Sequence, residues 1–133
     1  MFALLLAAAA QAAQPATPSA IEGRWISPSR DVIIAIAPCG DAQCGTVTWA
    51  TEQAQADARR GVESLVGSQL LTDLKPSSDG EWKGRLFIPD RKLRVTAKLA
   101  PQGADALKVS GCEIGICKSQ IWFRSEGSLP SEQ

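Results

Sequence analysis

The chain of 133 residues contains no histidine and no tyrosine, and its 14 basic side chains are balanced by 14 acidic ones. The absence of histidine removes the side chain that proteins use most often as a general base and as a metal ligand. A net charge of zero lacks the basic excess that binding to nucleic acid or to an anionic membrane surface requires. We therefore expect no metal, no cofactor and no nucleic-acid partner.

Motifs for catalysis are also missing. The sequence has no Gly-x-Ser-x-Gly elbow, and its 11 glycines are scattered singly among turns rather than gathered in a phosphate-binding loop. Asp57 with Arg59 is a charge pair of the kind usually found on a solvated surface. We expect no catalytic residues, and we expect that the protein is not an enzyme.

The first twelve residues have the pattern of a secretory signal. Residues 2–10 form an unbroken apolar run, which is too short to span a bilayer, and Ala10-Gln11-Ala12 provides a small-x-small cleavage pattern. We expect export to the periplasm or secretion, with no integral membrane span once the signal is removed. The length favours one folded domain. The expected organisation is a signal peptide at 1–12, a flexible mature N-terminus at 13–20, a β-barrel domain at 21–125 and a flexible tail at 126–133.

Four cysteines form two equally spaced pairs, Cys39 with Cys44 and Cys112 with Cys117. In an oxidising compartment an even number of cysteines indicates disulfides, and four cysteines permit three connectivities. We favour pairing within each short loop, because Gly40 and Gly115 give each loop a flexible turn; the spacing does not exclude the longer bridges. A four-cysteine zinc site is the rival, but it usually has shorter spacings and reducing surroundings.

Beyond residue 20, apolar and polar side chains mostly alternate with a period of two, as they do in strands. Leu93, Val95, Ala97 and Leu99 alternate with basic residues and a threonine. Proline- and glycine-containing turns separate the runs, a pattern typical of an all-β barrel or sandwich. The runs predict about eight strands near 21–27, 31–37, 44–50, 68–75, 81–88, 92–100, 106–112 and 118–124.

One segment interrupts this pattern. Residues 52–66 are rich in Ala, Gln, Glu and Arg, which favours a short helix or an ordered loop between the third and fourth strands. Gly61 disfavours a long helix there, because glycine is a poor helix former.

Two motifs at opposite ends of the expected mature chain resemble those of lipocalin and calycin barrels. Gly23-Arg24-Trp25 opens the first strand, and Arg124 closes the last. The first and last strands of an up-and-down barrel are neighbours, so Arg124 can lie across the Trp25 ring. The resemblance implies that Gly23, Trp25 and Arg124 close one end of a lipocalin-like antiparallel barrel, and we expect their role to be structural.

The chain more closely resembles the small exported bacterial proteins catalogued as domain of unknown function 2147, whose members fold as lipocalin-like barrels. The resemblance runs from Ile21 to Arg124. It rests on the following motifs: Gly23-x-Trp25, Cys39-Gly40, Cys44-Gly45, Val47-x-Trp49, Leu65-x-Gly67, Trp82-x-Gly84, Pro89-Asp90, Gly111-Cys112 and Gln120-x-Trp122-x-Arg124. The chain departs from the family after Pro89, where Asp90-Arg91-Lys92-Leu93-Arg94 lacks the family's glycine and tyrosine. The resemblance implies a fold and a location, but no biochemical activity.

A barrel of eight strands has room either for one small ligand or for a complete filling of side chains. If a cavity exists, we expect its lining to include Trp49, Trp82, Leu86, Leu93 and Val95. The leading hypothesis is a non-catalytic barrel that binds a small apolar or amphipathic ligand. The alternative is an envelope module that binds a protein partner, of unknown identity, through surface loops such as residues 52–66.

Overall fold

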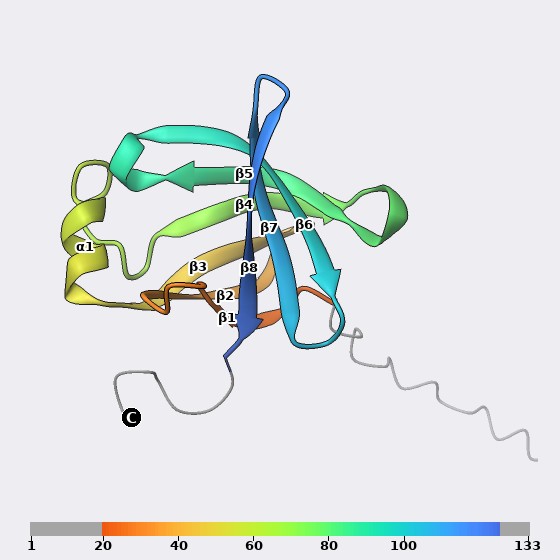
Figure 1. The fold of residues 1–133 in the computed structure, drawn as a ribbon, viewed down its shortest axis with the longest axis horizontal. Helices are drawn as coiled ribbons and strands as arrows, with labels where there is room; N and C mark the ends of the chain where they lie inside the picture. The colour runs from red at the N-terminus through yellow and green to blue at the C-terminus, as the bar shows by residue number, and fades with distance from the viewer. Residues whose placement is uncertain (1–19, 126–133) are drawn as a thin grey trace, which may run out of the picture.

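The computed structural model describes residues 20–125, which form a closed barrel of eight antiparallel strands in sequence order (Figure 1). Each strand pairs with the next, and β8 returns to β1. This arrangement confirms the all-β, up-and-down barrel expected from the sequence. The strands are β1 (Gly23–Ile26), β2 (Val32–Cys39), β3 (Ala42–Ala50), β4 (Gln69–Pro76), β5 (Trp82–Ile88), β6 (Leu93–Gln102), β7 (Ala106–Glu113) and β8 (Ile116–Arg124).

Every strand begins and ends within two residues of its predicted position. The period of two was a strong signal because one face of each strand must meet the barrel interior. In β6, Val95, Ala97 and Leu99 are buried, whereas Arg94 and Lys98 are exposed. The alternation along this strand therefore reports directly which side chains point inward.

A helical insertion lies between β3 and β4. Helix α1 (Glu52–Ala58) begins at Thr51, whose hydroxyl accepts a hydrogen bond from the Ala54 amide at 3.1 Å. Such a cap satisfies an amide that has no partner within the first turn. The helix buries Ala58 against the barrel and ends before Gly61. Two short 3-10 turns, η1 (Ser78–Gly80) and η2 (Pro89–Arg91), complete the helical structure of residues 20–125.

The structure pairs Cys39 with Cys44 and Cys112 with Cys117, so each disulfide closes its own short loop, as the sequence favoured. The two bridges sit at the tips of different hairpins. Cys112 and Cys117 lie directly opposite each other in the β7–β8 register, next to the two-residue turn Ile114–Gly115. Both turn residues have positive φ, 51° and 75°, as a tight two-residue hairpin requires.

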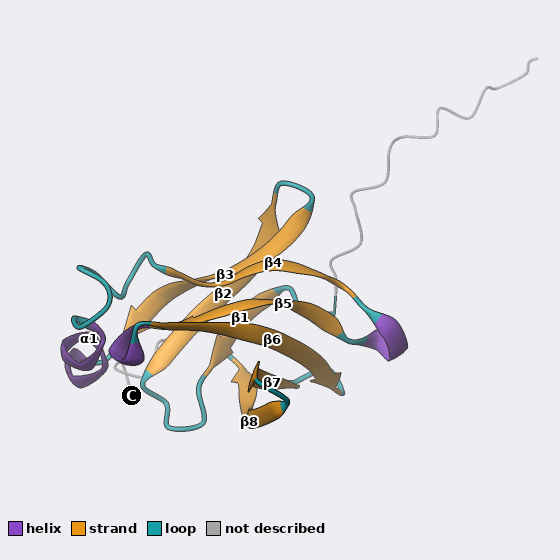
Figure 2. Ribbon diagram, turned by 90° about the horizontal axis from the view of Figure 1, so that it is seen from above, coloured by secondary structure: helices purple, strands orange, loops and turns teal. Residues whose placement is uncertain are grey.

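Turns alternate between the two ends of the barrel. At one end, which we call the closed end, lie residues 20–22 and the turns after β2, β4 and β6. At the other, the open end, lie helix α1 and the turns after β1, β5 and β7. Figures 1 and 2 show α1 beside the β5–β6 turn, and Figure 1 shows the β7–β8 hairpin projecting beyond the rest of the barrel. The two ends of the barrel are therefore built differently.

The core fills the closed end and the interior between β1 and β4. Trp25, Ile34 and Val47 lie side by side on β1, β2 and β3, and each is almost fully buried. Leu71 and Leu74 of β4 extend the same cluster, and Leu99 and Leu107 complete it from β6 and β7. At the open end of the barrel, the interior beside β5 to β8 is not filled by this cluster of buried side chains.

Residues 20–125 contain no helix that is both long enough and apolar enough to cross a membrane. The expected signal peptide at 1–12, the N-terminal segment up to residue 19 and the expected tail at 126–133 lie outside the described residues.

Candidate ligand cavity and the closed end of the barrel

Trp25 and Arg124 close one end of the barrel together. The Trp25 side chain is 0% exposed, and its indole N–H donates to the Ile21 carbonyl at 2.9 Å. The guanidinium carbon of Arg124 lies 4.1 Å from the centre of the Trp25 ring. Such a contact combines the attraction of a cation for an aromatic face with the packing of a flat group on a ring. Arg124 therefore covers the side chain that plugs this end.

Hydrogen bonds from Arg124 also join β8 to two other chain segments, residues 20–22 and the β6–β7 turn. Its Nε donates to the Ala104 carbonyl at 2.9 Å and its Nη1 to the Glu22 carbonyl at 2.8 Å, while Nη2 lies 3.5 Å from the Ala20 carbonyl. Gly23 makes room for the guanidinium, because a Cβ at this position would lie 2.5 Å from Nη1, and its φ of 121° is unfavourable for other residues. The structure thus brings together the three residues expected to close the barrel.

A cavity of about 750 Å³ occupies the open end, between β5 to β8 and the β1–β2 turn. Its inner wall is apolar and comes from six strands. The wall residues are Val32, Leu70, Leu86, Leu93, Val95, Val109 and Trp122. A cavity of this volume falls within the range of about 300 to 1,000 Å³ that is usual for small-molecule sites.

The mouth of the cavity carries polar groups beside the exposed apolar residues of the β7–β8 hairpin. Ser27, Ser29 and Asp31 line it from the β1–β2 turn, where both serine hydroxyls donate to the Asp31 carboxylate at 2.7 and 2.8 Å. The Ser27 hydroxyl in turn accepts from two backbone amides, which fixes the turn. Asp90 and Arg91 line the opposite side. The site therefore combines an apolar interior with a rim of charged and hydroxyl groups.

Of the five residues expected to line a cavity, Leu86, Leu93 and Val95 do line it. Trp82 does not, because it stands at the beginning of β5, opposite Leu99, and packs against the core cluster nearer the closed end. The cavity reaches only the far half of β5. Whether any of these residues binds a ligand stays a prediction.

Trp49 also lies outside the cavity lining, and a β-bulge explains why. The β2–β3 register pairs Ile34 with Val47 but Ile33 with Trp49, so one extra residue, Thr48, is accommodated on β3. Val47 faces the interior, whereas Trp49 shares the outer face with Ile33 and, through the β1–β2 register, with Ile26. The simple alternation Val47-x-Trp49 suggested a shared face, and the bulge breaks it.

Four lining residues of β8 were not predicted. Ile116, Lys118, Gln120 and Trp122 line the cavity, and the Trp122 indole N–H donates to the Gln120 side chain at 3.2 Å. The sequence contained a signal for them. Once Arg124 is placed on Trp25, every second residue before it must point to the same side of the strand. Polar side chains at two of these positions obscured the pattern.

The long β3–β4 insertion packs against the cavity mouth. A Cβ at Gly61 would collide with the Pro89 carbonyl, so glycine allows the two backbones to approach closely. Pro89 itself lines the cavity. The insertion and the mouth of the cavity are therefore in close contact at Gly61 and Pro89.

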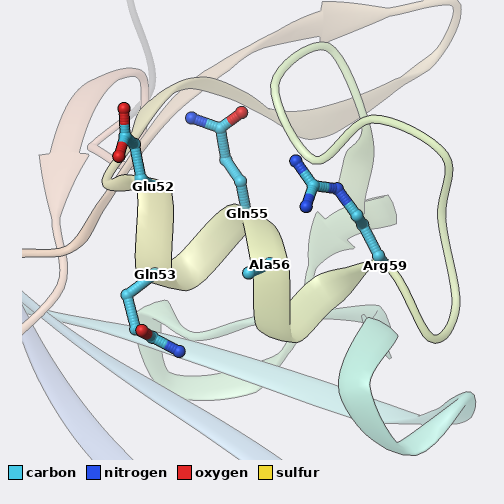
Figure 3. Close-up of a pocket in the computed structure, with 5 residues that line it drawn as sticks. All are labelled: Glu52, Gln53, Gln55, Ala56 and Arg59. Carbon is cyan, nitrogen blue, oxygen red and sulfur yellow. The ribbon is translucent and has the colours of Figure 1, made fainter.

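A second, polar concavity lies on helix α1 (Figure 3). Its lining comes entirely from the helix and from the C-cap residue that follows it: Glu52, Gln53, Gln55, Ala56 and Arg59. In Figure 3 the side chains of Glu52, Gln55 and Arg59 extend to one side of the helix and that of Gln53 to the other. No second element contributes a converging group, so this surface gives no support to a particular ligand. Binding of a protein partner by residues 52–66 stays a prediction.

Two disulfides indicate a compartment outside the cytoplasm, because the reducing conditions of the cytoplasm disfavour such bonds.

Comparison with known proteins yields a family and no individual relative. Neither the curated proteins nor the solved structures contain a match to this chain. The sequence profile of a bacterial family matches residues 23–124, which is nearly the whole barrel. The chain therefore belongs to the family described as uncharacterized protein conserved in bacteria, domain of unknown function 2147.

Proposed function

We propose that the protein is an exported, non-catalytic barrel that binds one small apolar or amphipathic molecule in the cavity at its open end. The observation that carries this proposal is the cavity itself, about 750 Å³ with a wall of aliphatic side chains and one tryptophan. Apolar surface that a ligand covers no longer contacts water, which favours binding in proportion to the area covered.

The arrangement of polar groups supports an amphipathic ligand. An apolar portion fits against Leu86, Val95 and Val109, while a polar group remains at the mouth near Lys118 and Arg91. A polar group held at the mouth keeps its hydrogen bonds to water, so its burial costs little. The ligand then enters with its apolar end first.

Export to the periplasm or beyond is part of the proposal. The apolar leader supports it on the sequence side, and the two disulfides support it on the structural side. Small apolar molecules are poorly soluble in such aqueous compartments, where a carrier or sensor has a clear use.

A pair of fluorescent probes tests the proposal. N-phenyl-1-naphthylamine is apolar, and 1-anilinonaphthalene-8-sulfonate adds an anionic group to the same rings. We expect both to bind with a stoichiometry of one, and we expect Val95→Phe to reduce the affinity by about tenfold or more, because the larger ring occupies the cavity.

Thr96→Phe is the matched control, because it adds the same ring one residue further on, where the side chain faces away from the cavity. This variant should bind both probes as the wild type does. Equal affinities of the wild type and Val95→Phe, or no binding to the folded wild type, would contradict a ligand site in the barrel.

A further inference from the structure

Strand β8 is paired along its whole length on one side only. It pairs with β7 from Ile116 to Phe123, but within residues 20–125 its pairing with β1 is limited to Phe123 and Arg124. β1 has only four residues, and the chain turns away at Ser27. The edge of β8 from Ile116 to Trp122 therefore has no neighbouring strand among the described residues.

The backbone groups at this edge belong to every second residue. The Arg124 amide donates to Asp105 on the β7 side, and the Ser125 amide donates to Arg24 on the β1 side. Antiparallel ladders alternate in this way, so odd-numbered residues of β8 point their N–H and C=O groups away from β7. At Cys117, Ser119 and Ile121 these groups meet no strand within the described barrel.

The side chains along the edge are self-complementary about Ser119. One residue away on either side lie the polar Lys118 and Gln120, and beyond them the pattern is apolar in both directions, with Cys117 and Ile116 before and Ile121 and Trp122 after. In an antiparallel pair of two β8 strands centred on Ser119, polar residues lie opposite polar residues and apolar residues opposite apolar ones. Lys118 lies opposite Gln120 of the second copy, and Ile116 lies opposite Trp122 of the second copy.

Neighbouring registers are worse. Moving the centre to Lys118 places two lysines directly opposite each other, which is destabilising. Moving it to Gln120 requires pairing at Phe123, where β1 already lies. Of these three registers, only the one centred on Ser119 avoids both faults, and it keeps the inner faces of the two strands on the same side.

The exposed apolar surface and the shape of the molecule fit such a pairing. Of the large apolar side chains that are exposed within residues 20–125, all but Val66 lie on the β7–β8 hairpin, where Ile116 is 69% and Ile121 37% exposed. The hairpin projects beyond the other strands in Figure 1. In an antiparallel pair of two such hairpins, the bodies of the two barrels therefore lie at opposite ends of the joined ribbon. Lys118 is the only charge from Ile116 to Phe123, too few to protect the edge against pairing.

We propose that two copies of this chain associate through their β8 edges, in an antiparallel register centred on Ser119, and so join two β7–β8 hairpins into one four-stranded ribbon. The three pairs formed by Cys117, Ser119 and Ile121 exchange backbone hydrogen bonds across the two-fold axis.

Amide hydrogen exchange, followed residue by residue in a series of protein concentrations up to about 1 mM, tests this register, since that range reaches weak specific association. The amides of Cys117, Ser119 and Ile121 should become more protected as the concentration rises. Those of Lys118 and Gln120, which face β7, should not change. Sedimentation equilibrium on the same samples should show a monomer–dimer exchange.

Ser119→Pro removes the central amide at the free edge and should leave a folded monomer. Ser119→Ala is its control, because both variants lose the 2.7 Å hydroxyl contact between Ser110 and Ser119, while alanine keeps the amide. If the proline variant does not fold, Gln120→Lys and Gln120→Glu replace it. Each changes two symmetric contacts to Lys118, and we expect the dissociation constant to rise about tenfold with lysine and to fall with glutamate.

A wild-type protein that stays monomeric at every concentration overturns the proposal. So does a dimer whose protection is not confined to the alternate residues of β8, or one that Ser119→Pro leaves intact.

Discussion

At the closed end of the barrel, Trp25 is fully buried beneath an arginine that holds three backbone carbonyls. Two residues before that arginine on β8, Trp122 is only partly buried, lines the apolar cavity and donates to a neighbouring glutamine side chain. Both tryptophans belong to the strands that close the barrel, and they lie on the same inner face. The difference between them shows how one short strand, β1, divides the molecule. Where β1 pairs with β8, the interior is sealed and packed. Where β1 ends, the wall opens and space remains for a ligand.

The largest expected effect separates the two tryptophans. Trp25→Ala removes a side chain that is packed on all sides, and we expect it to lower the free energy of unfolding by about 3 to 5 kcal/mol. Trp122→Ala removes a partly exposed ring at a cavity, and we expect a loss below about 2 kcal/mol. Urea unfolding followed by far-UV circular dichroism measures both. Equal losses would mean that the plug of the closed end and the wall of the cavity are packed alike.

A smaller effect compares two arginines that stack on aromatic rings. Arg124→Ala removes the contact with Trp25 and the hydrogen bonds to residues 20–22 and to the β6–β7 turn, and we expect a loss of about 2 kcal/mol. Arg94 lies 5.1 Å from the Phe87 ring centre but is exposed, so Arg94→Ala should change stability by no more than about 0.5 kcal/mol. Thermal unfolding of both variants measures the two losses of stability. If Arg94→Ala lowers stability as much as Arg124→Ala does, stacking on the ring accounts for the effect of Arg124, and the hydrogen bonds between segments do not.

The smallest expected difference in stability concerns the two disulfides, one at each end. The double variants Cys39→Ser with Cys44→Ser, and Cys112→Ser with Cys117→Ser, open loops of equal length. Each should therefore lower stability by about 2 kcal/mol. The bridges should differ in binding. The hairpin held by Cys112 and Cys117 carries Glu113, Ile114 and Ile116 of the cavity lining, so only its opening should weaken binding of the naphthylamine probes. Weaker binding in both double variants would argue against a cavity confined to the open end.

The sequence was most informative where a single physical rule decides the outcome. The period of two and the turns between the runs placed most strands, since one face of each must be buried. The run at 31–37, which is apolar on both faces, was placed by its β-branched residues. The Trp25–Arg124 contact followed from the neighbourhood of first and last strands in a closed barrel. Local cysteine pairing was favoured because a glycine-containing turn lies between the two cysteines of each pair.

The candidate site was harder to predict because it depends on details that alternation does not contain. The bulge at Thr48 moves Trp49 to the outer face, and no turn residue in the sequence next to Thr48 indicates a bulge there. The early end of β1 depends on the turn that Ser27 and Asp31 organise, and this ending creates both the opening of the cavity and the free edge of β8. A polar inner face, such as that of Lys118 and Gln120, resembles an outer face in the sequence.

Native mass spectrometry of the protein purified from its own compartment tests the central claim most directly. If the open end is a binding site, the wild type carries one small molecule that is apolar or amphipathic, Thr96→Phe carries the same molecule, and Val95→Phe carries none. A wild type that is recovered without any bound molecule and also fails to bind either naphthylamine probe would contradict the claim.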